Sequence, residues 1–176
     1  MTLIFIGFIF VLLDLNISVG QSVIGLIPDF VGYLFIYLGL REFAMKGDKL
    51  GTAKIFSLLC LVLSLASYIL DILAVIEAGA AAVVFAGVQL IMGLYLMYLI
   101  VFGLNDIEKS GVILDCKNLL LFFYIEAGMS VLFFAAAALN SYIGSGTYIV
   151  TAIYIAATVL FLGAFLKTKR LFEAQM

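Results

Sequence analysis

The stretch that decides the fold is IGLIPDFVGY, residues 24–33, which contains the only proline of the chain, Pro28, with Asp29 directly behind it. Proline has no backbone N–H and a φ angle near about −65°, so it fits the first turn of a helix, where that donor would have no partner. An acid beside it accepts hydrogen bonds from free N–H groups and favours the positive end of the helix dipole. We therefore predict a helix that begins at Pro28.

The residues directly before this helix are too few to form a transmembrane helix. A first apolar helix is predicted to end near Ile17, and residues 18–27 are apolar enough to enter a membrane but too few to cross it. Irregular backbone at membrane depth is tolerated only where protein or a water-filled cavity satisfies its polar groups. We predict a re-entrant or interfacial segment here, on the extracytoplasmic side. The alternative is one continuous helix that is kinked at Pro28.

The chain as a whole is too apolar for a water-soluble protein. Hydrophobic residues make up 66% of it, charged residues only 11%, and the mean hydropathy is +1.32, whereas a soluble domain is about half apolar and a quarter charged. Runs such as FSLLCLVLSLASYIL, residues 56–70, lack the two-residue alternation of a barrel strand. The composition therefore predicts an all-α polytopic membrane protein.

Hydropathy and turn signals predict six transmembrane helices in a single domain, residues 1–176. The predicted helices are Thr2–Ile17, Pro28–Met45, Ala53–Glu77, Ala80–Leu104, Val112–Leu139 and Thr147–Lys167. All nine basic residues lie at the junctions between an even and the next odd helix, including the adjoining helix ends, or in the C-terminal tail. By the positive-inside rule, both termini are then cytoplasmic.

Five acids fall in the half of the predicted bundle that contains no basic residue: Asp14, Asp29, Asp71, Glu77 and Glu126. An acid within a membrane costs at least about 2.5 kcal/mol on insertion scales, so it is expected to be paired, protonated or facing water or a ligand. Asp29 is also explained as a helix cap, and Asp14, Asp71 and Glu77 can reach the interface. For Glu126 two readings stay open, a functional group or a protonated glutamate that is hydrogen-bonded to a facing helix.

Tyrosines accompany one of these acids along a helix face. Asp29, Tyr33 and Tyr37 recur at four-residue spacing and therefore lie on one side of their helix. Carboxylates beside tyrosine rings suit a cation through charge and cation–π attraction, although most membrane tyrosines anchor at the interface or pack. The predicted cation-binding residues, which share one outward cavity, are Asp14, Asp29, Tyr33, Tyr37, Asp71 and Glu126.

Several classes of chemistry have no support in the sequence. The chain has no histidine, which excludes zinc-dependent membrane proteases and histidine-based acid–base catalysis. Cys60 and Cys116 lack CxxC spacing and are interpreted as free packing thiols. There is no GxGD protease motif, so we expect no enzyme, no cofactor and no metal site.

The N-terminal part of the chain has a familiar pattern. The run GFIFVLLDLNISVGQSVIGLIPDFVGYLFIYLGL, residues 7–40, resembles an uncharacterised family of small polytopic membrane proteins of Gram-positive bacteria of the Clostridium and Bacillus type. In that family an acid-containing first helix is followed by a Leu/Ile-Pro-Asp-Phe-x-Gly-Tyr motif. The matching residues are Asp14, Asn16, Gly25, Pro28, Asp29, Phe30, Gly32 and Tyr33. The resemblance implies a bacterial cytoplasmic-membrane protein and brings no activity with it.

The leading hypothesis is a membrane transport or solute-binding protein with an outward-facing, acidic, tyrosine-lined cavity for a cation, a basic solute or protons. Its expected partners are the lipid bilayer and that solute. A homo-oligomer or a partner membrane subunit is left open, and no nucleic acid is expected. The alternative is a non-transporting assembly, immunity or regulatory protein that acts through helix–helix contacts. Convergence of the acids on one cavity would favour the first hypothesis.

Overall fold

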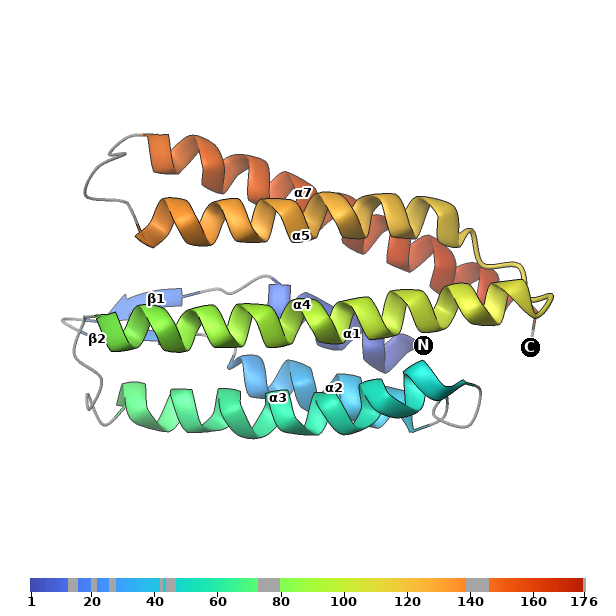
Figure 1. Cartoon of the computed structure of the whole chain (residues 1–176), viewed down its shortest axis with the longest axis horizontal. Coiled ribbons are helices and arrows are strands. Elements are labelled where there is room, and N and C mark those ends of the chain that lie inside the picture. Colours follow the sequence, from blue (N-terminus) through green and yellow to red (C-terminus); the bar gives the residue numbers. More distant parts are fainter. Residues whose placement is uncertain are drawn as a thin grey trace.

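The computed structural model describes residues 1–12, 16–19, 22–25, 28–41, 43, 47–72, 80–138 and 146–175. These residues form six helices and one short antiparallel strand pair, so the predicted all-α class is confirmed (Figure 1). The helices are α1 (Thr2–Leu12), α2 (Asp29–Leu40), α3 (Asp48–Ile72), α4 (Ala80–Lys109), α5 (Cys116–Ala138) and α7 (Gly146–Glu173). The strands are β1 (Asn16–Val19) and β2 (Ser22–Gly25).

Four described helices, and not the six predicted, are long and apolar enough to cross a membrane. These candidate spans are Asp48–Leu70, Val83–Lys109, Cys116–Ala138 and Tyr148–Glu173. The helices α1 and α2 have 11 and 12 residues, and at about 1.5 Å per residue each covers little more than half of a bilayer core about 30 Å thick. The prediction of six full-length transmembrane helices is therefore not supported, while four apolar helices indicate a membrane protein.

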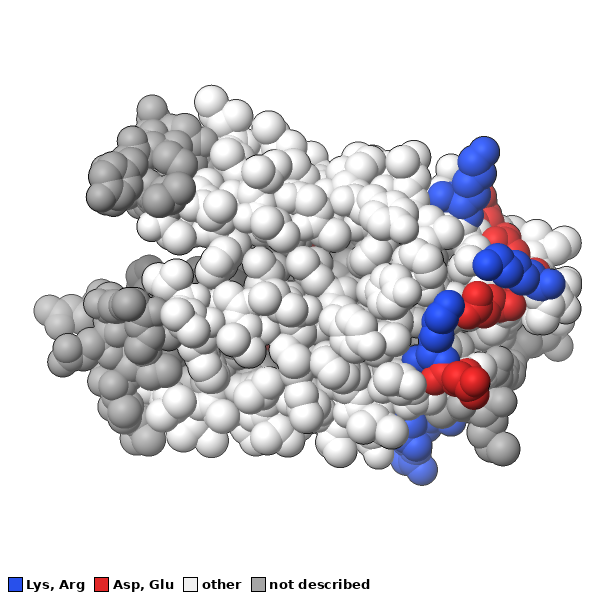
Figure 2. Space-filling model, in the orientation of Figure 1, with Lys and Arg blue, Asp and Glu red and all other residues white. Residues whose placement is uncertain are grey.

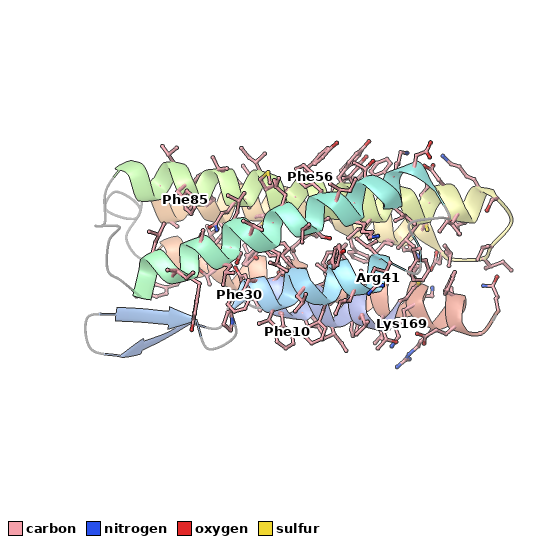
Figure 3. All side chains as sticks on the ribbon, turned by 90° about the horizontal axis from the view of Figure 1, so that it is seen from below. Phe10, Phe30, Arg41, Phe56, Phe85 and Lys169 are labelled. Carbon is pink, nitrogen blue, oxygen red and sulfur yellow. The ribbon has the colours of Figure 1, made fainter. Side chains whose placement is uncertain are left out.

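The two N-terminal helices are short because the chain between them forms a β-hairpin. The strands pair from Asn16 opposite Gly25 to Val19 opposite Ser22, so the predicted helix over Thr2–Ile17 is wrong at its C-terminal end. β-Branched residues such as Ile17 and Val19 fit an extended strand better than a helix. Figure 3 shows the hairpin beyond the ends of α1 and α2, at the opposite end from Arg41 and Lys169. That this segment touches a membrane interface stays a prediction.

The helix start at Pro28 is confirmed. Pro28 is extended, with φ −65° and ψ 129°, and α2 begins at the next residue, Asp29. The carbonyl of Pro28 accepts a hydrogen bond from the backbone N–H of Val31 at 3.0 Å. The alternative of one continuous helix kinked at the proline is therefore wrong.

Pairwise packing joins the six helices into a closed ring. Each helix of the series α1, α2, α3, α4, α5 and α7 packs on the next, and α7 packs back on α1. Glycines bring the first two helices unusually close. A Cβ atom built on Gly32 would lie 2.8 Å from the carbonyl oxygen of Gly7, and one built on Gly39 would lie 2.9 Å from the backbone nitrogen of Ile4. The seven-residue spacing of Gly32 and Gly39 thus forms a close-packed seam, as small residues do between membrane helices.

Charged side chains gather at one end of the ring. Figure 2 shows the lysines, arginines and acids of the described surface at the end where both termini lie in Figure 1. The hydroxyl of Thr2 donates a hydrogen bond to Glu173 at 3.0 Å, and the ammonium of Lys49 lies 2.8 Å from the carboxylate of Asp106. The N-terminus, the C-terminus and the α3 N-terminus therefore share this end, which we call the charged end.

The connection between α4 and α5 is held by carboxylates at the charged end. The backbone N–H of Cys116 donates to the carboxylate of Glu108 at 3.2 Å, which satisfies a donor of the first turn of α5. Asp115 has a φ of +58°, a left-handed conformation that aspartate tolerates better than most residues. Hydrogen bonds from Lys167 and from Asn118 hold the pKa of Asp115 below its ordinary value.

The interior of the ring near the charged end is filled with side chains. The ring of Phe8 meets those of Phe161 and Phe165 edge to face, with centroids 5.6 and 5.1 Å apart. Ile100 and Leu104 of α4 are also fully buried in this core. The interior of the ring is therefore packed with side chains near the charged end.

Candidate solute-binding cavity

A cavity of about 310 Å³ lies inside the ring, and every one of the six helices contributes to its wall. Its lining comes from the later part of α3, the earlier part of α4 and the later part of α5, which places it in the half away from the charged end. Figure 2 shows the surface hollowed in the same half, between the part formed by α5 and α7 and the part formed by α4 and α3. The polar residues of the lining are Asp29, Tyr33, Ser64, Gln89, Ser130 and Tyr154.

The two short helices end at this cavity. Val11 and Leu12 of the last turn of α1 line it, and so does Asp29, the first residue of α2. The C-terminal end of a helix carries partial negative charge and the N-terminal end partial positive charge. The C-terminal end of α1 therefore presents partial negative charge to the cavity. At the N-terminal end of α2, the carboxylate of Asp29 offsets the partial positive charge of the helix.

Tyr33 lies one turn beyond Asp29 on the same face of α2. Its side chain is buried, with 8% exposed, and a Cβ atom built on Gly93 of α4 would lie 3.3 Å from the tyrosine hydroxyl. The absence of a side chain at Gly93 therefore makes room for this hydroxyl at the cavity wall. The predicted pairing of Asp29 with Tyr33 on one helix face agrees with their positions in the cavity.

The remaining polar groups come from the other side of the ring. The Gln89 amide of α4 donates a hydrogen bond to the hydroxyl of Ser67, which binds α4 to α3 beside the cavity. Ser130 of α5 is buried. The rings of Phe133 and Tyr154 stack at 4.9 Å with an angle of 11° between their planes, and this pair joins α5 to α7 in the wall.

Glu126 is fully buried but does not belong to the cavity lining. The hydroxyl of Thr158 on α7 donates to its Oε1 at 3.0 Å, and its Oε2 has no hydrogen-bond partner among the described residues. Glu126 precedes the lining residue Ser130 by about one helical turn, or about 6 Å. The structure thus places this acid between α5 and α7, as in the sequence alternative of a glutamate bonded to one facing helix.

The other predicted site residues are distributed as follows. Tyr37 is not in the lining, and the ammonium of Lys54 lies 5.8 Å from the centre of its ring. Asp14 lies outside the described residues, and Asp71 lies near the end of α3 with a side chain that is not described. The structure therefore brings Asp29 and Tyr33 together at the cavity and leaves Glu126 and Tyr37 outside its wall. The shared role of these residues stays a prediction.

Sequence reasoning did not select several residues of the wall. Ser64, Ser130, Phe133 and Tyr154 line the cavity but were not predicted. Single serines and aromatic residues are common in membrane helices, so none of them is a specific signal. A polar position such as Ser64 acquires meaning only when its neighbours in the ring are known.

No family model, no curated protein and no solved structure matches this chain. The class of the protein follows from its own fold: an all-α protein whose apolar helices include four that are long enough to cross a membrane.

Proposed function

We propose that this protein is an integral membrane protein that binds, and carries or hands on, a small cationic solute in its interior cavity. The observation that carries the proposal is the position of Asp29 on the wall of a cavity that is lined by all six helices. The described lysines and arginines lie toward the other end of these helices. A cation is the ligand that such a wall favours, because the described lining residues include a carboxylate and no lysine or arginine.

The interrupted helices support a transport role. In many transporters the substrate site is formed where discontinuous helices end inside the membrane. Here α1 ends and α2 begins at the cavity wall. An 11-residue helix and a four-residue strand together extend roughly 30 Å, which equals the thickness of the hydrocarbon core. We therefore retain six crossings as a proposal, with the first two built half from helix and half from the hairpin that packs on α3.

The positive-inside rule assigns the charged end to the cytoplasm, so that both termini are cytoplasmic and the cavity lies in the outward half. The resemblance of residues 7–40 to a Gram-positive membrane family supports a bacterial cytoplasmic membrane. Both assignments are part of the proposal.

The topology is tested with introduced cysteines. A cysteine at Gly47 or at Ser110, both exposed at the charged end, should resist an impermeant thiol reagent in intact cells, and one at Ser145 should react. The native thiols of Cys60 and Cys116 are buried and should give little background. Reaction at Gly47 from outside would overturn this orientation.

The functional proposal is tested by neutralising the acid in the cavity. Asp29→Asn should weaken the binding of a cation by purified protein at least about 30-fold, because loss of one partner of a buried charge pair costs about 2 kcal/mol or more. The binding assay would use K⁺, Mg²⁺, methylammonium and 2-phenylethylamine. Asp48→Asn is the matched control, since Asp48 is also a first-turn acid but is exposed at the charged end.

If none of these cations bound in a manner that depends on Asp29, the proposal would fail. The non-transporting alternative would then be favoured. The position of Glu126, held in a helix–helix contact with Thr158 and not in the cavity wall, is the observation that supports that alternative.

A further inference from the structure

The chemistry of the cavity wall also indicates which kind of cation it accepts. We propose that the cavity binds an organic monocation, a protonated amine with a ring-sized apolar body, in preference to a metal ion. This inference rests on the proposed function and deepens it by naming the solute class.

The charge of the wall fits a single positive charge. Among the lining residues that the structure describes, Asp29 is the one carboxylate. No group of three or more histidine, cysteine, aspartate or glutamate residues that could hold a metal occurs in the described part of the chain. Calcium takes about six to eight oxygen ligands, often from several carboxylates. One carboxylate instead balances one ammonium group and accepts its N–H donors.

The volume of the cavity is too large for an ion alone. Its 310 Å³ lies at the lower end of the range for small-molecule pockets, about 300–1,000 Å³. A dehydrated metal ion would leave most of this space to water beside an apolar wall. A molecule with an apolar body of at least one aromatic ring fits into this space, since a cavity of about 150 Å³ already holds benzene.

The carboxylate and the phenylalanine rings of the wall lie on opposite sides of the ring of helices. Asp29 and Tyr33 lie on α2, whereas Phe133 and Phe134 lie on α5, and the order of packing places α2 and α5 on opposite sides of the ring. Tyr154 stacks on Phe133 at 4.9 Å and extends the aromatic side. An ammonium group would therefore bind near Asp29 while its apolar body packs against the aromatic rings of α5 and α7, to which cations are also attracted.

The side of the wall that holds Asp29 offers hydroxyl groups that suit an N–H donor. The hydroxyl of Tyr33 and the hydroxyl of Ser64 both line the cavity and can accept hydrogen bonds. A protonated primary or secondary amine supplies such donors, and a quaternary ammonium group does not. The wall thus favours the protonated amine within the class of organic cations.

The test uses purified wild-type protein in detergent and ligands that separate charge from bulk. The amine 2-phenylethylamine should bind at least about ten-fold more tightly than methylammonium, because burial of the ring adds about 1.5–3 kcal/mol. It should also bind more tightly than 2-phenylethanol, which has the same body without the charge. Gly93→Leu should weaken binding of 2-phenylethylamine by filling the space beside Tyr33, whereas Gly128→Leu should not, because a Cβ at Gly128 meets nothing within 4 Å.

The outcomes separate this inference from the proposed function. Binding of K⁺, Mg²⁺ or methylammonium that depends on Asp29, without tighter binding of 2-phenylethylamine, would overturn the amine class and leave the cation site in place. Equal binding of 2-phenylethanol and 2-phenylethylamine would overturn recognition of the charge. Absence of all Asp29-dependent binding would remove the proposed function itself.

Discussion

Replacement of Gly32 by leucine is expected to prevent close packing of α1 on α2 and to lower the free energy of unfolding by about 3 kcal/mol or more. Even the first added atom, the Cβ, would lie 2.8 Å from the carbonyl oxygen of Gly7 and 2.7 Å from a methyl group of Val11. Overpacking a well-packed core costs about 1–3 kcal/mol where side chains can adjust. Here the obstacle includes backbone of the facing helix, so the helices themselves must separate.

The native cysteines provide the measurement. Cys60 and Cys116 are buried, and the chain has two cysteines in total, so a thiol-reactive fluorophore reports unfolding in detergent as the temperature rises. The matched control is Gly128→Leu, which alters a helical glycine with nothing near its Cβ position and should leave the midpoint unchanged or higher. An unaltered midpoint for Gly32→Leu would show that α1 and α2 do not approach as closely as described.

Replacement of Glu126 by lysine is expected to destabilise the protein by about 3–5 kcal/mol, or to prevent its accumulation in the membrane. Glu126 is fully buried between α5 and α7, where Thr158 is its hydrogen-bond partner. A lysine at this position would place an ammonium group among apolar side chains without a carboxylate partner among the contacts described for Glu126. A buried charge without compensation carries a penalty of this size.

The informative comparison is Glu126→Gln in the same assay. Glutamine has nearly the same shape and keeps an oxygen that can accept the hydrogen bond of Thr158, so its stability should stay within about 1.5 kcal/mol of the wild type. The difference in stability between the lysine and glutamine variants then measures the free-energy cost of a buried positive charge at this position. Equal unfolding midpoints for the wild type and Glu126→Lys would contradict the burial of this position.

Local sequence was sufficient where one residue restricts the backbone. Pro28 cannot donate the hydrogen bond that a helix interior requires, so the start of α2 was predictable, and Asp29 followed as its first residue. The gathering of lysines and arginines at the end that holds both termini was also predictable, because hairpins of apolar helices bring alternate connections to the same end.

Local sequence was not sufficient where apolar residues suit two structures. Residues Asn16 and Ile17 were predicted to end a helix but belong to a strand. Hydropathy measures only the preference for leaving water, which an apolar helix and an apolar strand share. Pairing of Asn16–Val19 with Ser22–Gly25 supplies the backbone hydrogen bonds that a longer helix would otherwise have made.

The candidate site also has residues whose positions were predictable from local sequence and residues whose positions were not. The four-residue spacing of Asp29 and Tyr33 placed them on one helix face, and the structure puts that face on the cavity. The position of Glu126 relative to the cavity was not readable, because α5 is apolar on all sides and its sequence does not show which face meets α7 and which meets the cavity.

The sequence by itself determined that this is an all-α chain with apolar helices, that one helix starts behind Pro28 and that the lysines and arginines lie at one end. These properties depend on composition and on single-residue geometry. The tertiary structure alone decided that α1 and α2 are too short to cross a bilayer core by themselves and that six helices close into a ring. It also decided that Asp29 lines the cavity, whereas Glu126 accepts a hydrogen bond from Thr158 outside the cavity wall. Those outcomes depend on how closely neighbouring helices approach, which for α1 and α2 is set by glycines whose contacts lie far away along the chain, as Gly32 meets Gly7 and Gly39 meets Ile4.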